Sequence, residues 1–190
     1  MVRYLSAAII ILVGSVYASV LITNGDFEEP LTTGWHQAAG GSYCYVDRAT
    51  NYDPDADYEA SARVDSLSGG GVAVLYQEVA IPTTDLEFSV NAKLFAWDNN
   101  ADTLCCAGAA VIITYIDGSG TSLGETKICR FTDPFNWSNS STCHLIISPD
   151  TNWHNYSFNI NDELTNLPGV NPADIKKIKV SLYAKTDHTC

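Results

Sequence analysis

The chain has 190 residues, with 10 Lys and Arg against 22 Asp and Glu, and a formal net charge of −12. Such an acidic protein is a poor partner for nucleic acid or for an anionic membrane surface, since both require a basic face. With 46% hydrophobic and 17% charged residues, the composition is typical of one folded, β-rich domain and argues against a disordered chain.

The first 18 residues have the pattern of a secretory signal peptide. Met1–Arg3 gives a positive start, Leu5–Tyr17 is an almost unbroken apolar run, and Val16–Ala18 ends it with small or compact residues. The alternative is an N-terminal anchor, but a membrane-spanning helix needs about 20 apolar residues and this run is shorter. We therefore expect cleavage before Ser19, secretion of the mature chain and no membrane insertion.

Nine segments of strand length follow, separated by turns that contain Gly, Pro, Asn and Asp. In the segment that begins at Leu86, apolar and polar residues alternate, as in a strand with one buried face. Only Ala173–Ile175 suggests a helical turn. We predict that residues 19–190 form a single all-β domain, an antiparallel β-sandwich or jelly roll. The predicted strands are Val20–Phe27, Ser42–Asp47, Glu59–Ser66, Val72–Ile81, Leu86–Asp98, Ala109–Ile116, Leu123–Phe131, Trp153–Ile160 and Lys176–Lys185.

All six cysteines follow the predicted cleavage site, and an even number in an exported chain indicates disulfide bonds. Cys129 and Cys143 flank a polar segment and are the predicted pair, while the remaining pairings stay open. The adjacent Cys105 and Cys106 are expected to bond to different partners. A zinc site that combines these two thiols with Cys143 and His144 is the alternative, although its spacing differs from the usual zinc motifs.

The start of the mature chain resembles that of galactose-binding-like carbohydrate-binding modules. Leu21–Glu28 contains the block Asn-Gly-Asp-Phe-Glu, and Gly34-Trp35 follows it. Further along, the Trp-led segment Trp153–Phe158 and the segment Ile178–Ala184 resemble later strands of the same modules. The resemblance covers nearly the whole mature chain. It implies a jelly roll of the group that binds polysaccharides such as cellulose and xylan.

The same resemblance implies a structural calcium ion (Ca²⁺) near the first strand, with Glu28 among its ligands. These modules also close with a further strand that carries an Asp, whereas this sequence stops at Cys190, so we expect a sandwich without its last strand. A second candidate for calcium is the group Asp53, Asp55 and Asp57, whose carboxylates fall on one side of an extended chain. The alternative for these acids is a solvated loop.

The sequence carries no motif of the common hydrolases. It has no Gly-x-Ser-x-Gly turn and no His-Glu-x-x-His pair, and its histidines, at 36, 144, 154 and 188, lie far apart along the chain. We therefore predict a protein without catalytic activity.

Sugar binding requires flat aromatic side chains beside amide and carboxylate groups. Trp97 ends a predicted strand close to Asn99, Tyr115 lies on another strand, and Trp137 lies in the polar loop that the predicted disulfide would close. We predict these four residues as carbohydrate contacts and the protein as a secreted glycan-binding module. The alternative is an extracellular adhesion or surface scaffold that contacts cell-surface proteins and binds no sugar.

Overall fold

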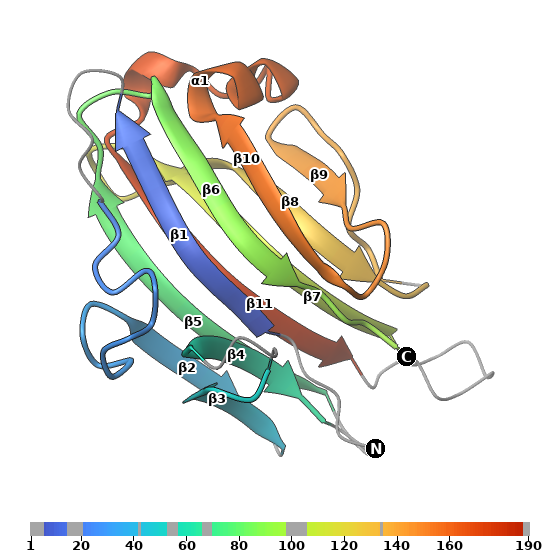
Figure 1. Cartoon of the computed structure of the whole chain (residues 1–190). Helices are drawn as coiled ribbons and strands as arrows, with labels where there is room; N and C mark the ends of the chain where they lie inside the picture. The colour runs from blue at the N-terminus through green and yellow to red at the C-terminus, as the bar shows by residue number, and fades with distance from the viewer. Residues whose placement is uncertain are drawn as a thin grey trace.

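The computed structural model describes residues 6–14, 21–41, 43–52, 57–65, 70–97, 106–133 and 135–187. They form two β-sheets packed face to face, and in Figure 1 β1, β6 and β10 lie in front of β5, β11, β7 and β8. The predicted all-β sandwich is confirmed. Sheet A consists, in spatial order, of β10 (Trp153–Asn159), β6 (Leu86–Lys93), β1 (Ser6–Gly14), β4 (Glu59–Val64) and β3 (Cys44–Ala49). Sheet B consists of β2 (His36–Gly40), β5 (Gly71–Ala80), β11 (Lys177–Asp187), β7 (Cys106–Ile116), β8 (Ser122–Phe131) and β9 (Cys143–Ile147).

Neighbouring strands in the described sheets run antiparallel, except for β8 and β9, which are parallel. Alternate residues of each long strand point into the sandwich, as the period of two requires. On β11, for example, Ile178, Val180 and Leu182 are buried. The same parity sends the other residues of β11 to the outer face of sheet B.

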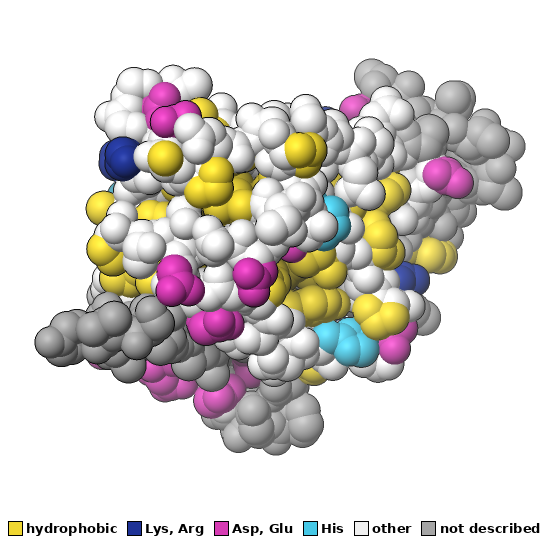
Figure 2. Space-filling view, turned by 90° about the horizontal axis from the view of Figure 1, so that it is seen from above, with side chains coloured by type: hydrophobic (Ala, Val, Ile, Leu, Met, Phe, Trp, Pro, Cys, Tyr) yellow, Lys and Arg dark blue, Asp and Glu magenta, His cyan; other side chains and the backbone are white. Residues whose placement is uncertain are grey.

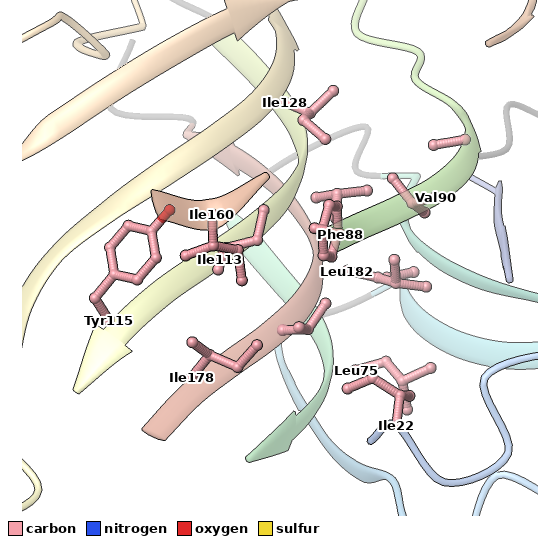
Figure 3. Packing of buried hydrophobic residues seen from close by; sticks show 14 of the residues in the cluster. Ile22, Leu75, Phe88, Val90, Ile113, Tyr115, Ile128, Ile160, Ile178 and Leu182 are labelled. Atoms are coloured by element: carbon pink, nitrogen blue, oxygen red, sulfur yellow. The ribbon is translucent and has the colours of Figure 1, made fainter. Parts of the chain in front are cut away.

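The core fills the space between the sheets, as Figure 3 shows. Phe88 of β6 is fully buried and lies 5.3 Å from the ring of Phe158 of β10, measured between ring centroids. Tyr115 of β7 lies in the same cluster, close to Ile113 and Ile160 in the view of Figure 3, and is also fully buried. Aromatic side chains from both sheets therefore pack together in the core of the sandwich.

The helices are short and lie at one end of the sandwich, at the top of Figure 1. They are α1 (Ile160–Glu163) and the 3₁₀ turns η1 (Leu164–Asn166) and η2 (Pro172–Asp174). The last of these lies within one residue of the predicted turn at Ala173–Ile175. None of the described helices is long and apolar enough to cross a membrane.

The predicted strand Val20–Phe27 is wrong where the structure describes it, from residue 21 onward, because these residues form turns. Asn24 and Phe27 have φ angles of 51° and 58°, in the left-handed region, which an extended strand does not use. The segment is held in place by Trp35, whose indole Nε1–H donates to the Asn24 carbonyl (2.9 Å). The Trp35 side chain is buried, in agreement with a packing role.

Three observed strands were not predicted. The strands β2 and β9 are short edge strands, and β1 lies inside the segment predicted as a signal peptide. The backbone of β1 pairs with β6 from Ser6 opposite Lys93 to Gly14 opposite Leu86, and with β4 on its other side. This segment therefore fills an internal position of sheet A, between two strands that it joins.

Candidate functional site

Four aromatic side chains gather on the outer face of sheet B; we call Phe131, Phe135, Trp137 and Tyr183 the aromatic cluster. The ring of Trp137 lies 4.6 Å from that of Phe135, 5.7 Å from Phe131 and 5.9 Å from Tyr183, between centroids. All four side chains are partly exposed. They rest on a small apolar base on the outer side of the sheet, formed by Ala110, Ile112 and Cys129.

Hydrogen bonds between Thr132 and Ala107 of β7 anchor the loop after β8, which carries Phe135 and Trp137. The Thr132 N–H donates to the Ala107 carbonyl (2.9 Å), and the Thr132 hydroxyl accepts from the Ala107 N–H (3.0 Å). The ring of Phe135 then covers Gly108, where a Cβ atom would lie only 2.8 Å from the ring. A side chain at position 108 would displace Phe135, so the glycine is required by this close approach.

Two lysines border the aromatic cluster. The Lys127 ammonium lies 5.4 Å from the centroid of the Trp137 ring and forms an ion pair with Glu125. The Lys185 ammonium lies 6.0 Å from the Phe135 ring and 3.6 Å from a carboxylate oxygen of Asp187. Burial, together with the nearby charge of Glu125, raises the pKa of Tyr183. The cluster thus offers aromatic faces beside charged groups that can donate and accept hydrogen bonds.

The predicted disulfide between Cys129 and Cys143 is wrong. In the parallel pairing of β8 and β9, Cys143 lies opposite Glu125, whereas Cys129 lies opposite Ile147. Four residues of strand span about 13 Å, and a disulfide needs Cα atoms within about 7 Å. Both cysteines are free thiols, so the loop between them is held by hydrogen bonds and ring packing.

Thiol alkylation should therefore modify Cys129 and Cys143 without prior reduction. Cys143 should react first in the folded protein, because it is half-exposed, whereas Cys129 is buried and its burial raises its pKa to about 12. Cys129 should react only after denaturation, since the thiolate is the reactive form. Mass spectrometry of peptides alkylated with and without urea measures both rates. Recovery of a peptide pair linked through these two cysteines would contradict the structure.

The structure separates the other predicted carbohydrate contacts. Tyr115 points into the core and is fully buried (Figure 3), so its prediction as a sugar contact is wrong. Trp97 is 43% exposed, but it follows β6 of sheet A, in the other layer from the aromatic cluster. Asn99 lies outside the described residues. The structure places Trp137, by contrast, among other partly exposed rings.

Two of the four predicted calcium ligands, Glu28 and Asp57, lie in the described part of the chain, and the Glu28 carboxylate contacts the residue after Asp57. Glu28 is exposed, and its Oε1 accepts a hydrogen bond from the Tyr58 N–H (3.1 Å). The Arg48 guanidinium donates to the Glu28 carbonyl (2.5 Å) and to the Phe27 carbonyl, which places a positive charge beside Glu28. Asp57 is exposed, while the other two predicted ligands, Asp53 and Asp55, lie outside the described residues.

No group of three or more His, Cys, Asp or Glu side chains in the described part could hold a metal ion. The Arg48 charge also opposes a cation bound through the Phe27 and Glu28 carbonyls. Two of the four predicted ligands lie outside the described residues, so the structure does not test the calcium site. Calcium binding stays a prediction, which rests on the resemblance for Glu28 and on the spacing of the carboxylates for Asp53, Asp55 and Asp57.

A second polar group lies at the end of the sandwich that carries the helices. Glu163, at the end of α1, is 6% exposed, and its Oε1 accepts from the Thr126 hydroxyl (2.9 Å) and lies 2.5 Å from Nδ1 of His144. Its Oε2 accepts from the Asn166 amide (3.1 Å), and Thr126 in turn contacts the Tyr115 hydroxyl (3.0 Å). We call these five residues the Glu163 network.

The order of groups in the Glu163 network differs from that of a nucleophile and its base. The His144 imidazole and the Thr126 hydroxyl both bind the same carboxylate oxygen of Glu163, so the carboxylate lies between them. A nucleophilic hydroxyl would need the imidazole as its own hydrogen-bond partner. The network therefore joins β7, β8 and β9 to α1 and satisfies a buried carboxylate. Figure 2, which views this end, shows acidic and histidine side chains beside exposed hydrophobic ones.

No family model matches this chain, and a search of the curated proteins finds no matching sequence.

Proposed function

We propose that the protein is a secreted, non-catalytic glycan-binding module of the jelly-roll type and that the aromatic cluster contacts the sugar. The cluster itself supports this proposal most directly, since it keeps the rings of Phe135, Trp137 and Tyr183 partly exposed on a rigid sheet. Exposed rings stack on the apolar faces of pyranose units. The carboxylate of Glu125 and the ammonium of Lys185, which are both partly exposed, serve the sugar hydroxyls.

Secretion is part of the same proposal, and the apolar segment of residues 1–18 supports it. Cleavage of that segment would require the rest of the chain to fold without β1, which the structure places inside sheet A. A polysaccharide outside the cell is then the partner. The alternative proposal, an adhesion scaffold that contacts proteins, uses the same exposed rings as an apolar patch. Binding experiments on the aromatic cluster distinguish the two, because only the first requires affinity for isolated glycans.

Replacing Trp137 with alanine should weaken glycan binding by about tenfold or more, since central aromatic contacts carry much of the binding free energy. The purified protein is first screened on a glycan array, and the best polysaccharide is then titrated by calorimetry. Trp137→Phe should keep part of the affinity because it retains a ring. Circular dichroism establishes that each variant is folded.

The matched control is Tyr45→Ala, which removes a ring that is 39% exposed on β3 of sheet A, away from the aromatic cluster. It should leave the affinity unchanged. Trp97→Ala is measured beside it, because Trp97 was predicted as a contact from sequence. Failure of the wild-type protein to bind any glycan would contradict the proposed function and favour the scaffold.

A further inference from the structure

The outer face of sheet B has a row of lysines on a central strand. In β11, Lys177, Lys179 and Lys185 have the same outward parity as Tyr183, and all four are partly exposed. The strand lies between β5 and β7 and so crosses the middle of the sheet. The row from Lys177 to Lys185 covers nine residues, or about 26 Å of extended chain. We call these three residues the lysine row.

Small and apolar side chains flank the lysine row at the end where it meets the aromatic cluster. Gly108 and Val72 lie opposite Lys185 on the two neighbouring strands, and Ala110 and Val74 lie opposite Tyr183 in the same way. The Phe135 ring covers Gly108, and the Lys185 ammonium lies 6.0 Å from the centroid of that ring, with its side chain 39% exposed. The row and the aromatic cluster therefore form one continuous surface around Tyr183.

The charge of this surface is close to neutral, unlike that of the whole protein. Its partly exposed lysines are the lysine row, against Glu78, Glu125 and Asp187 as the acids on the strands of the same face, while Lys127 is buried and paired with Glu125. In the whole chain, by contrast, 22 acids stand against 10 basic residues. A nearly neutral face with three lysines is the part of such an acidic molecule that best tolerates a negatively charged ligand.

The ring geometry indicates what form the ligand takes. The Trp137 ring is inclined at 72° to that of Phe135 and at 80° to that of Phe131. Rings at such angles do not make a flat platform, so they do not match the planar surface of a crystalline polysaccharide. They fit a single chain, whose sugar units present faces and edges in turn.

We propose that the outer face of sheet B binds a single glycan chain that carries acidic groups, such as uronate carboxylates, laid along β11. The sugar rings contact the aromatic cluster, and the acidic groups meet Lys179 and Lys185. This inference rests on the proposed function, because it names the class of glycan that the same site takes. Neutral and crystalline polysaccharides are then poor ligands.

The test compares polymers that share a backbone and differ in charge. The full-length protein is titrated with polygalacturonate and with its methyl ester, and with carboxymethyl and hydroxyethyl cellulose. Microcrystalline cellulose serves as the planar surface. The acidic member of at least one pair should bind about tenfold or more tightly than its neutral partner, and high salt should weaken that binding, since salt screens exposed charges.

The double variant Lys179→Gln/Lys185→Gln should bind the acidic polymer about two- to fivefold more weakly for each lysine removed, the range expected of exposed charge pairs. The matched control is Lys93→Gln, on β6 of sheet A, which should have no effect. Trp137→Ala should weaken binding to the same polymer, because the two groups act on one ligand.

Three outcomes decide the inference. Preference for the acidic polymers together with a loss in the lysine variants supports it. Equal binding of acidic and neutral polymers, lost in Trp137→Ala but not in the lysine variants, overturns the acidic ligand and leaves the glycan-binding function standing. Absence of binding to every polymer and to the glycan array overturns both.

Discussion

Replacing Glu163 with alanine should lower the free energy of unfolding by about 3 kcal/mol, since buried polar groups that lose their partner cost about 1–3 kcal/mol each. The substitution removes the acceptor of the buried Thr126 hydroxyl and of the Asn166 amide, and the partner of the His144 ring. It also leaves a cavity where α1 meets sheet B. Urea denaturation at neutral pH, followed by tryptophan fluorescence, measures the change.

Two further variants isolate the cause. Glu163→Gln keeps the shape and an acceptor oxygen, so it should cost only about 1 kcal/mol, the net contribution of a typical hydrogen bond. Asp162→Ala removes an exposed acid from the same turn and should change the stability by less than about 0.5 kcal/mol. Equal midpoints for Glu163→Ala and Asp162→Ala would show that the Glu163 network contributes nothing to stability.

The sequence predicts well the strands that have one buried face and one solvent-exposed face. In β6, Phe88 and Val90 alternate with Glu87 and Ser89, and the structure buries the first pair and leaves the second pair partly or fully exposed. Alternation arises because burial on one side imposes a period of two. The edge strand β2 lacks this signal. All five of its residues are exposed, so burial does not impose an alternation of apolar and polar residues on it.

The mistaken assignment of Tyr115 has a physical origin in β7. This strand is buried on both faces, because its inward residues meet the core and its outward residues Ala110 and Ile112 lie beneath the aromatic cluster. A strand covered on both sides shows no alternation, so its sequence does not reveal which residues point outward. For Trp137 the sequence has no such ambiguity, because its polar neighbours in the loop indicate exposure.

The contacts between residues within each site could not be predicted from the sequence, for a different reason. Trp137 meets Tyr183 only because the outer side of β11 comes close to the loop after β8, and this follows from the spatial order of the strands. In the Glu163 network, His144 and Glu163 are 19 residues apart and lie on different elements. No local motif records either contact, since strand order and register are set by the whole fold.

A chain that begins at Ser19, as cleavage of the predicted signal peptide would leave it, should lose roughly 5 kcal/mol of stability or more, from several lost backbone hydrogen bonds of about 1 kcal/mol each and from exposure of the core between the sheets. In the full chain, β1 forms eight registered pairs with β6 and also pairs with β4. A loss of this size approaches the whole stability of many domains, about 5–15 kcal/mol. Thermal melts of the two chains, followed by circular dichroism, measure the difference.

Without β1, the edges of β4 and β6 present unpaired N–H and C=O groups, so the shortened chain should also self-associate, as measured by light scattering. A synthetic peptide of residues 6–14 with a solubilising tag should raise its melting temperature by filling the open position. The same peptide with Ile10→Pro is the control, because proline lacks the N–H that the pairing needs. If the chain from Ser19 melts at the temperature of the full chain and neither peptide changes that temperature, β1 contributes nothing to the stability of sheet A.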